Sequence, residues 1–283
     1  MKFLVTGALG QLGRVTVEHL QSRGIDALGT DIPEVPVDDK DRLAAVFAGY
    51  QPTHVLHCGA ITDVDGCETN PDLAFRVNGD GTANVAELCR SSGAAMLYVS
   101  TDFVFAGESD RPYRHDDEPA PVSVYGESKL AGEKAVLAAG APNFYVARTA
   151  WVFGAGGKNF PLAILNRARS GEPLRVVDDQ VGSPTMTRDL AEAIVDLVSS
   201  GAEGGVYHAT NDGSCSWHQF ACDIVAAAGI DVEVGTMSSA ELDRPAKRPS
   251  YSILDCSRLA EVRGRTLPSY QDALKRYIEE ELA

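Results

Sequence analysis

Tyr125 and Lys129 stand four residues apart in the segment Val-Tyr-Gly-Glu-Ser-Lys-Leu. A tyrosine hydroxyl can donate a proton to an oxygen atom, but its ordinary pKa of about 10 makes it slow to cycle at neutral pH. Side chains four residues apart on a helix are neighbours, so the Lys129 ammonium is expected to favour the phenolate and to lower the pKa of Tyr125. The same spacing is also typical of a surface tyrosine beside a solvated lysine.

A glycine-rich turn, Gly7-Ala-Leu-Gly-Gln-Leu-Gly13, follows an apolar run near the N-terminus and precedes a helical pattern. Glycines permit a tight turn and close approach of a ligand to the backbone, and a helix N-terminus favours negative charge. The order strand, turn and helix therefore predicts the pyrophosphate site of a dinucleotide. The residues expected to contact it are Gly7, Gly10, Gln11, Leu12 and Gly13.

Acidic residues follow the second apolar run. Asp31 lies eighteen residues after Gly13. A carboxylate there accepts hydrogen bonds from the adenosine ribose and repels a 2′-phosphate, which mildly favours NADH over NADPH. Asp31 can also be interpreted as an ordinary turn residue at the end of a strand. Asp38 and Asp39 are placed to reach the adenine, although a helix N-cap is an equally good interpretation of Asp39.

Two hydroxyls, Ser100 and Thr101, end a further apolar run. In a parallel sheet the carboxyl ends of the strands face the ligand crevice, so a hydroxyl there can polarise the carbonyl that Tyr125 protonates. With a nicotinamide as hydride donor, the set predicts carbonyl reduction. Taken alone, Ser-Thr-Asp is more typical of a strand-end turn.

The first half of the chain alternates apolar runs with helical patterns, which predicts a Rossmann-type α/β fold, a doubly wound parallel sheet covered on both faces. The expected strands are Phe3–Thr6, Ala27–Thr30, His54–His57, Met96–Ser100 and Phe144–Arg148. The expected helices are Gln11–Arg23, Asp39–Gly49, Asp72–Ser92 and Ser123–Leu137.

The second half is more irregular and suits a smaller region that covers a ligand. We expect a dinucleotide-binding domain at 1–150, rejoined by about 187–212, and a mainly substrate-binding region at 151–283. The expected helices are Pro161–Arg169, Thr187–Ser199, Ser216–Ala228 and Ser269–Glu280, and the expected strands are Leu174–Val177 and Val206–Ala209.

The amino-acid composition excludes some classes of binding partner. The chain has 283 residues, of which 44% are hydrophobic and 23% charged, with 25 basic and 40 acidic side chains and a net charge of −15. This balance disfavours nucleic acid and anionic membranes. The six cysteines have no C-x-x-C or metal-ligand spacing, so we expect reduced thiols, no metal and a cytoplasmic chain. The N-terminal apolar run is too short for a signal peptide or a membrane span.

These residues resemble the extended short-chain dehydrogenase/reductase family, which pairs G-x-x-G-x-x-G with Tyr-x-x-x-Lys and an upstream Ser or Thr. Further segments are similar to the dTDP-4-dehydrorhamnose reductase branch of that family, and they cover nearly the whole chain. They include Ile61-Thr-Asp-Val-Asp-Gly-Cys-Glu, Arg148-Thr-Ala-Trp-Val-Phe-Gly, Asp179-Gln-Val-Gly-Ser-Pro-Thr, Ser216-Trp-His-Gln-Phe-Ala and Arg248-Pro-Ser-Tyr-Ser-Ile-Leu-Asp.

The resemblance implies NAD(P)H-dependent reduction of the C4 ketone of a nucleotide-linked 4-keto-6-deoxysugar, with dTDP-4-dehydro-L-rhamnose as the first candidate. Tyr125 would be the proton donor, Lys129 its modulator and Thr101 the hydroxyl on the carbonyl. Cys58, Gly59 and Ala60 would line the cofactor. The implied substrate contacts are Thr62, Val64, Thr101, Asp102, Phe103, Trp151, Asn159, Gln180 and Arg248.

Several of these contacts have plainer interpretations. Trp151 is also a good core residue, Gln180 a turn residue, and Arg248 a partner for a surface carboxylate instead of a pyrophosphate. Some members of the family are dimers, so a homodimer is possible.

Three positions depart from the family pattern, each by loss of a hydroxyl: Phe103, Ala150 and Phe153. They leave the proton-transfer residues intact but bear on how the sugar is recognised. The competing functions are a reductase or epimerase of another nucleotide sugar, and a non-catalytic NADP-binding subunit similar to the regulatory subunit of methionine adenosyltransferase.

Overall fold

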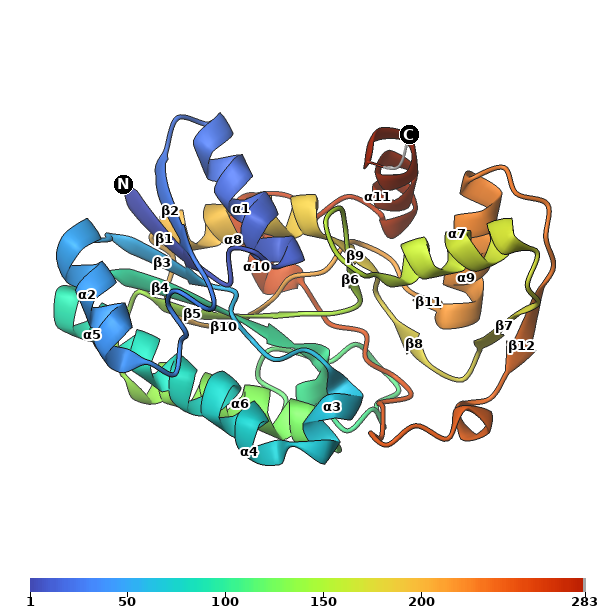
Figure 1. Cartoon of the computed structure of the whole chain (residues 1–283), viewed down its shortest axis with the longest axis horizontal. Coiled ribbons are helices and arrows are strands. Elements are labelled where there is room, and N and C mark those ends of the chain that lie inside the picture. The colour runs from blue at the N-terminus through green and yellow to red at the C-terminus, as the bar shows by residue number, and fades with distance from the viewer. Residues whose placement is uncertain (282–283) are drawn as a thin grey trace.

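The structure, a computed structural model that describes residues 1–281, is built on a six-stranded parallel sheet with a smaller lobe at one end (Figure 1). The strand order is β10-β5-β4-β3-β1-β2. The bounds are β1 Lys2–Thr6, β2 Asp26–Thr30, β3 His54–His57, β4 Ala95–Thr101, β5 Phe144–Thr149 and β10 Gly205–His208. The predicted α/β fold is confirmed, and the predicted strand ends agree to within one residue.

Helices cover both faces of the sheet because successive strand residues point to opposite sides. Phe3 and Val5 pack into one core cluster with residues of α1 and α8, whereas Leu4 packs into another with residues of α2, α5 and α6. The helices span α1 Gln11–Ser22, α2 Lys40–Tyr50, α5 Thr82–Ser92, α6 Val124–Ala138, α8 Thr187–Ser199 and α10 Ser257–Arg263.

The region between β3 and α5 differs from the predicted single helix. A short helix, α3 (Val64–Thr69), is followed by α4 (Pro71–Phe75) and by a π-helical turn, η1 (Arg76–Gly81). The expected helix Asp72–Ser92 is therefore helical but interrupted, and α3 was not predicted. A π-helical turn changes the direction of the side chains that follow it, which periodicity alone does not reveal.

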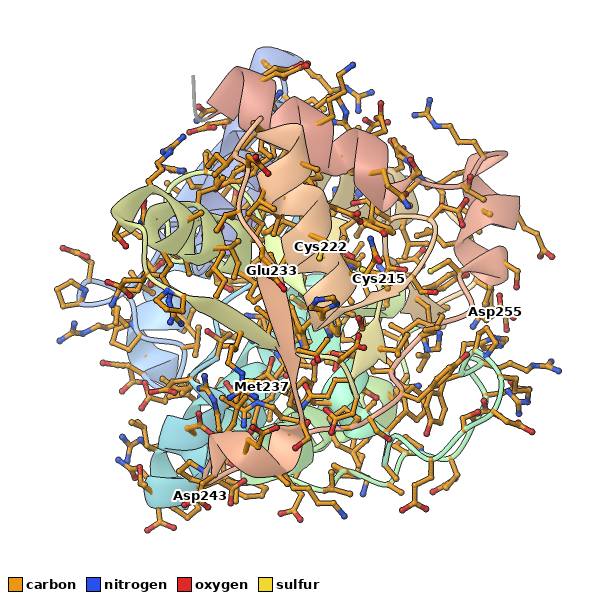
Figure 2. All side chains as sticks on the ribbon, turned by 90° about the vertical axis from the view of Figure 1, so that its right-hand side faces the viewer. Cys215, Cys222, Glu233, Met237, Asp243 and Asp255 are labelled. Carbon is orange, nitrogen blue, oxygen red and sulfur yellow. The ribbon has the colours of Figure 1, made fainter. Side chains whose placement is uncertain are left out.

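The smaller lobe packs three helices beside short strand pairs around its own apolar cluster. Figure 2 looks onto it, with Met237 at the end of β12 and Asp243 just after η3. Its elements are β6 Val152–Phe153, α7 Phe160–Ser170, β7 Leu174–Val177, β8 Val181–Gly182, β9 Thr185–Met186, β11 Cys215–Ser216, α9 Trp217–Ala227, β12 Val234–Met237, η3 Ser239–Leu242, α11 Tyr270–Arg276 and η4 Tyr277–Glu281. On the main lobe, a 3₁₀ turn, η2 (Asp102–Val104), follows β4.

All six cysteines are free thiols, as expected. Within residues 1–281, no helix combines the length and the apolar character needed to cross a lipid bilayer.

Candidate active site

The glycine-rich turn between β1 and α1 is held by close backbone contacts. Gly7 has φ +69°, and a Cβ there would lie 2.6 Å from the Cα of Gly59. A Cβ on Gly13 would clash with the carbonyl oxygen of Gly7. Gly10 precedes α1 and offers no side chain to cap it. The first N–H groups of α1 are therefore left for an anion, and the turn fits a dinucleotide pyrophosphate.

Of the three acidic residues predicted to contact the cofactor, Asp31, Asp38 and Asp39, Asp31 is the one that touches this turn. Its carboxylate accepts hydrogen bonds from the backbone N–H of Leu9 at 2.7 Å and of Ile32 at 2.8 Å. Asp39 is the N-cap of α2, which was the alternative interpretation of this residue. Asp38 forms an ion pair with Arg76 at 3.0 Å. The structure therefore gives Asp38 and Asp39 structural partners.

Helix α6 presents Tyr125 and Lys129 on one buried face. The Ser123 hydroxyl caps the helix at 3.2 Å from the N–H of Gly126, which fixes where the first turn begins. Tyr125 is 9% exposed and packs edge-on against Phe103, and Lys129 is 3% exposed.

The Lys129 ammonium donates to the carbonyl oxygen of Val99 at 2.8 Å and lies 4.2 Å from the centre of the Tyr98 ring. Burial lowers the pKa of Lys129 to about 7, opposed by the charge of Glu133. Burial also raises the pKa of Tyr125, opposed by a hydrogen bond with Thr101. The expectation that Lys129 lowers the pKa of Tyr125 is therefore wrong for this structure, because the cost of burying the phenolate dominates.

Thr101 ends β4 beside this pair, at the carboxyl edge of the sheet. Its hydroxyl donates to Oδ1 of Asp102 at 3.0 Å and accepts from the N–H of Phe103 at 3.2 Å. Asp102 is 2% exposed, and burial raises its pKa to about 6.

An ion pair that the sequence did not indicate lies behind Lys129. Glu133, one turn further along α6, accepts from Arg148 at 2.7 and 2.9 Å and from the Ser100 hydroxyl at 2.5 Å. The acid and the arginine are only 1% and 3% exposed. A bidentate pair of this kind fixes the carboxylate rigidly beside Lys129.

Asn78 is a second residue that sequence reasoning missed. It lies in the π-helical turn and is fully buried. Its amide bonds both the N–H and the C=O of Ile61, at 2.8 and 3.1 Å, and donates to Ser128 at 2.9 Å. It therefore joins the segment after β3 to the helix that carries Lys129. No spacing in the sequence signals this role.

A cavity of about 380 Å³ opens between this edge of the sheet and the smaller lobe. Aromatic rings from four segments line it: Phe103, Trp151, Phe160 and Trp217. The rings of Trp151 and Trp217 stack at 3.5 Å with an angle of 6° between their planes. Because Phe103 also packs against Tyr125, with ring centroids 5.6 Å apart, the cavity adjoins Tyr125.

The cavity is also lined by four arginines, Arg167, Arg175, Arg244 and Arg248, and by no Asp or Glu among the residues that the structure describes. Each arginine pairs with a carboxylate outside the lining: Arg175 with Glu241, Arg167 with Glu172, and Arg244 and Arg248 with Asp65. Four arginines against three carboxylates leave a positive charge at the cavity in a chain whose net charge is −15, which favours an anion. Flat aromatic surfaces beside guanidinium groups suit a nucleotide, whose base stacks and whose phosphates pair with arginine.

The predicted substrate contacts divide into two groups. Phe103, Trp151, Gln180 and Arg248 line the cavity, and Val64 packs with Tyr125 in a small apolar cluster. Thr62 is exposed just before α3. The residues predicted to line the cofactor, Cys58, Gly59 and Ala60, follow β3 beside the glycine-rich turn.

Asn159 does not line the cavity and has partners within the fold. It caps α7 at 2.9 Å from the N–H of Leu162 and donates to the Gly154 carbonyl and the Tyr277 hydroxyl. The cavity residues Trp217 and Arg244 were not predicted, because they reach the site from distant parts of the chain.

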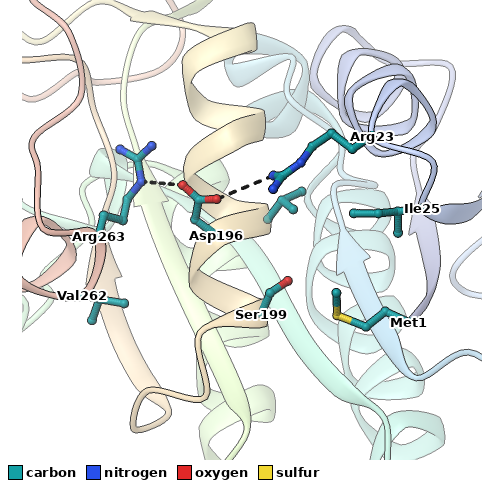
Figure 3. A pocket seen from close by; sticks show the side chains of 8 residues that line it. Met1, Arg23, Ile25, Asp196, Ser199, Val262 and Arg263 are labelled. Carbon is teal, nitrogen blue, oxygen red and sulfur yellow. Dashed lines mark hydrogen bonds and ion pairs between the residues drawn. The ribbon is translucent and has the colours of Figure 1, made fainter.

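A second cavity, of about 360 Å³, lies at the amino ends of β1 and β2, away from the sheet edge that carries Thr101 (Figure 3). Arg23 and Arg263 both reach Asp196 there, at 3.9 and 3.0 Å. Its cations thus pair with a carboxylate of its own lining, whereas the carboxylates that pair with the arginines of the first cavity lie outside that lining.

A doubly wound sheet, a glycine-rich turn that fits a dinucleotide, and a buried tyrosine–lysine pair beside Thr101 define an NAD(P)-dependent oxidoreductase of the short-chain dehydrogenase/reductase type.

Comparison with known proteins narrows this class. The family described as RmlD substrate binding domain matches residues 1–283, and the chain belongs to it. A dTDP-4-dehydrorhamnose reductase of Streptomyces griseus is 41% identical over 262 residues, covering 91% of this chain and 86% of that protein.

Two solved structures have nearly the same fold. A dTDP-4-dehydrorhamnose reductase of Clostridium acetobutylicum has a TM-score of 0.95 at 38% identity, with full coverage of both chains. That of Bacillus anthracis, in complex with NADP, has a TM-score of 0.94 at 35% identity and covers 99% of this chain and 100% of its own.

Proposed function

We propose that this protein reduces the C4 ketone of a nucleotide-linked 4-keto-6-deoxysugar with NAD(P)H, and that dTDP-4-dehydro-L-rhamnose, yielding dTDP-L-rhamnose, is its substrate. The observation that carries the proposal is the continuity between the proton donor and the cation-lined cavity, through Phe103. A nucleotide held by the aromatic rings and arginines would extend its sugar toward Tyr125. The names of the relatives at 38–41% identity support the same substrate.

The residues of the chain divide the chemical work. The glycine-rich turn binds the dinucleotide, which supplies the hydride when bound. The Tyr125 hydroxyl donates its proton to the ketone oxygen, and a protonated Lys129 stabilises the phenolate that this leaves. The Thr101 hydroxyl, which lies beside the phenol, would orient it toward the ketone. The burial of Tyr125 and Lys129 keeps water away from the reacting atoms.

The preference between the two cofactors stays a prediction. Asp31 favours NADH, because its carboxylate would repel a 2′-phosphate, whereas the Bacillus anthracis relative was solved with NADP. In this chain, hydrogen bonds from the N–H groups of Leu9 and Ile32 hold the Asp31 carboxylate at the turn. The ratio of kcat/KM for NADH and NADPH measures the preference. A cytoplasmic location and a homodimer also stay predictions.

Replacement of the proton donor tests the proposal. In Tyr125→Phe we expect kcat to fall by about 10²–10⁴-fold, the usual contribution of a positioned general acid, with unchanged affinity for the cofactor. The assay follows oxidation of NADH or NADPH over a panel of dTDP-, GDP- and UDP-linked 4-keto sugars. Stoichiometric consumption of the cofactor separates a reductase from an epimerase, which recycles it.

Tyr50→Phe is the matched control. It removes an exposed hydroxyl that bonds Asp26, far from the site. Near-normal turnover in Tyr125→Phe would show that another group donates the proton. Absence of turnover by the wild type on every sugar of the panel would refute the proposed function itself.

A further inference from the structure

A single carboxylate, Asp65, links the two lobes beside the cation-lined cavity. It lies in the first turn of α3 and is about a quarter exposed. Its oxygens accept hydrogen bonds from Arg248 Nη2 at 2.9 Å, Arg244 Nη1 at 3.0 Å and the backbone N–H of Ala246 at 3.2 Å. Three donors from one short segment thus converge on one acid of the other lobe.

Arg244 and Arg248 contact both the cavity and the carboxylate of Asp65. Arg244 and Arg248 line the cavity, whereas Asp65 does not. Arg248 donates a hydrogen bond from Nη1 to the carbonyl oxygen of Ala246 and another from Nη2 to Asp65. A guanidinium has five N–H donors, so each arginine keeps donors for a ligand. Two cations against one carboxylate also leave a net positive charge at this wall.

The segment that carries both arginines, residues 239–252, is fixed at each end. Ser239 donates its N–H to Asp179 at 2.9 Å, and the Ser250 hydroxyl donates to the Gly107 carbonyl at 2.8 Å. Asp65 anchors the stretch between them, in which Asp243 is labelled in Figure 2. The location of the arginine wall over the cavity therefore depends on this acid.

We propose that Asp65 is a positioning residue for substrate, holding Arg244 and Arg248 where their free N–H groups meet the diphosphate of the nucleotide sugar. The inference rests on the proposed function, which makes the ligand a nucleoside diphosphate. Without the carboxylate, two like charges repel and two long side chains regain rotamer freedom, which ligand binding must then remove. Asp65 touches no reacting atom, so its loss weakens binding and spares the chemical step.

The test compares Asp65→Asn, which keeps the shape and removes the charge, with the wild type. We expect the Kd for dTDP, measured by titration calorimetry, to rise about tenfold, the order expected for lost charge-assisted hydrogen bonds. The KM for the keto sugar should rise in parallel, while kcat and the Kd for the cofactor stay the same. Asp65→Glu, which keeps the charge, should restore part of the affinity.

Asp117→Asn is the matched control. It removes a carboxylate that accepts two hydrogen bonds from Arg111, from Nη1 and Nη2 at 2.8 Å each. Both residues lie in one loop that does not line the cavity. The substitution should leave dTDP affinity unchanged. Equal weakening in Asp117→Asn and Asp65→Asn would overturn the inference, as would dTDP binding by Asp65→Asn that matches or exceeds that of the wild type.

Failure of the inference is distinguishable from failure of the proposed function. Tight dTDP binding that Asp65→Asn loses, without turnover on any keto sugar, would refute the sugar assignment and leave the role of Asp65 standing. Normal reduction of the keto sugar by Asp65→Asn at an unchanged KM would refute the role of Asp65 alone. A wild type that binds no dTDP would refute the inference as well.

Discussion

At the scale of single residues, the proposed chemistry depends on keeping one cation charged in a place that disfavours charge. Burial lowers the pKa of Lys129 to about 7. The neighbouring thiol Cys58 and imidazole His57 are neutral at that pH, because burial raises the pKa of the first to about 12 and lowers that of the second to about 3. Glu133 is therefore the charged group that favours the ammonium.

Glu133→Gln should shift the pH dependence of activity. In the proposed mechanism Lys129 acts in its protonated form, so kcat/KM of the wild type should fall as the pH rises through the pKa of Lys129. Removing the Glu133 charge lowers that pKa further, and the fall should move to lower pH by about one unit. The amide can still accept a hydrogen bond from Arg148, although the loss of charge there destabilises the fold.

The measurement is the pH profile of kcat/KM, taken below the melting temperature of each variant. Glu87→Gln, which removes an exposed carboxylate paired with Lys40 on the outside of α5, is the control. An unshifted profile in Glu133→Gln would contradict the assignment of Lys129 as the ionising group.

At the scale of elements, local patterns predicted the parallel strands and most helices, because apolar runs and caps are encoded within each segment. Ser216 is an example, since it caps α9 as expected, at 3.1 Å from the N–H of Gln219. The cavity was only partly predictable. Trp217 and Arg244 meet there through tertiary packing, and the π-helical turn that buries Asn78 leaves no periodic signal.

The glycine-rich turn makes a prediction at this scale. Gly13→Ala places a Cβ against the Gly7 carbonyl oxygen, so the backbone of the turn must move. We expect a loss of about 1–3 kcal/mol in the free energy of unfolding and at least tenfold weaker cofactor binding, since α1 is shifted from the pyrophosphate. Thermal unfolding and fluorescence titration with NADPH measure the two effects.

Gly49→Ala is the control for that change. Gly49 lies near the end of α2, and a Cβ there meets nothing within 4 Å. It should stabilise the protein by up to about 1 kcal/mol, because alanine is the better helix former, and leave cofactor binding alone. A Gly13→Ala protein with normal NADPH affinity would mean that the turn tolerates the shift.

At the scale of the whole molecule, the chain crosses between the lobes more than once. After β6 and α7 it returns as α8 and β10, which complete the sheet and cover one of its faces. Leu190, Ile194 and Leu197 of α8 share a core cluster with Phe3 and Leu20. The dinucleotide-binding half therefore takes part of its core from residues beyond 150.

A chain of residues 1–150 alone should consequently fail to form a stable domain. It lacks α8, one of the helices that cover the Phe3 face, and β5 becomes an unpaired edge, so exposed apolar surface and aggregation are expected. Leu190→Ala in the full chain is the comparison. It should lose about 2–5 kcal/mol yet unfold cooperatively, because the cavity it creates leaves the topology intact. Thermal denaturation, monitored by circular dichroism, and dye binding to exposed apolar surface distinguish the fragment from the Leu190→Ala protein. A cooperative transition and NADPH binding by residues 1–150 would instead make that half an autonomous domain.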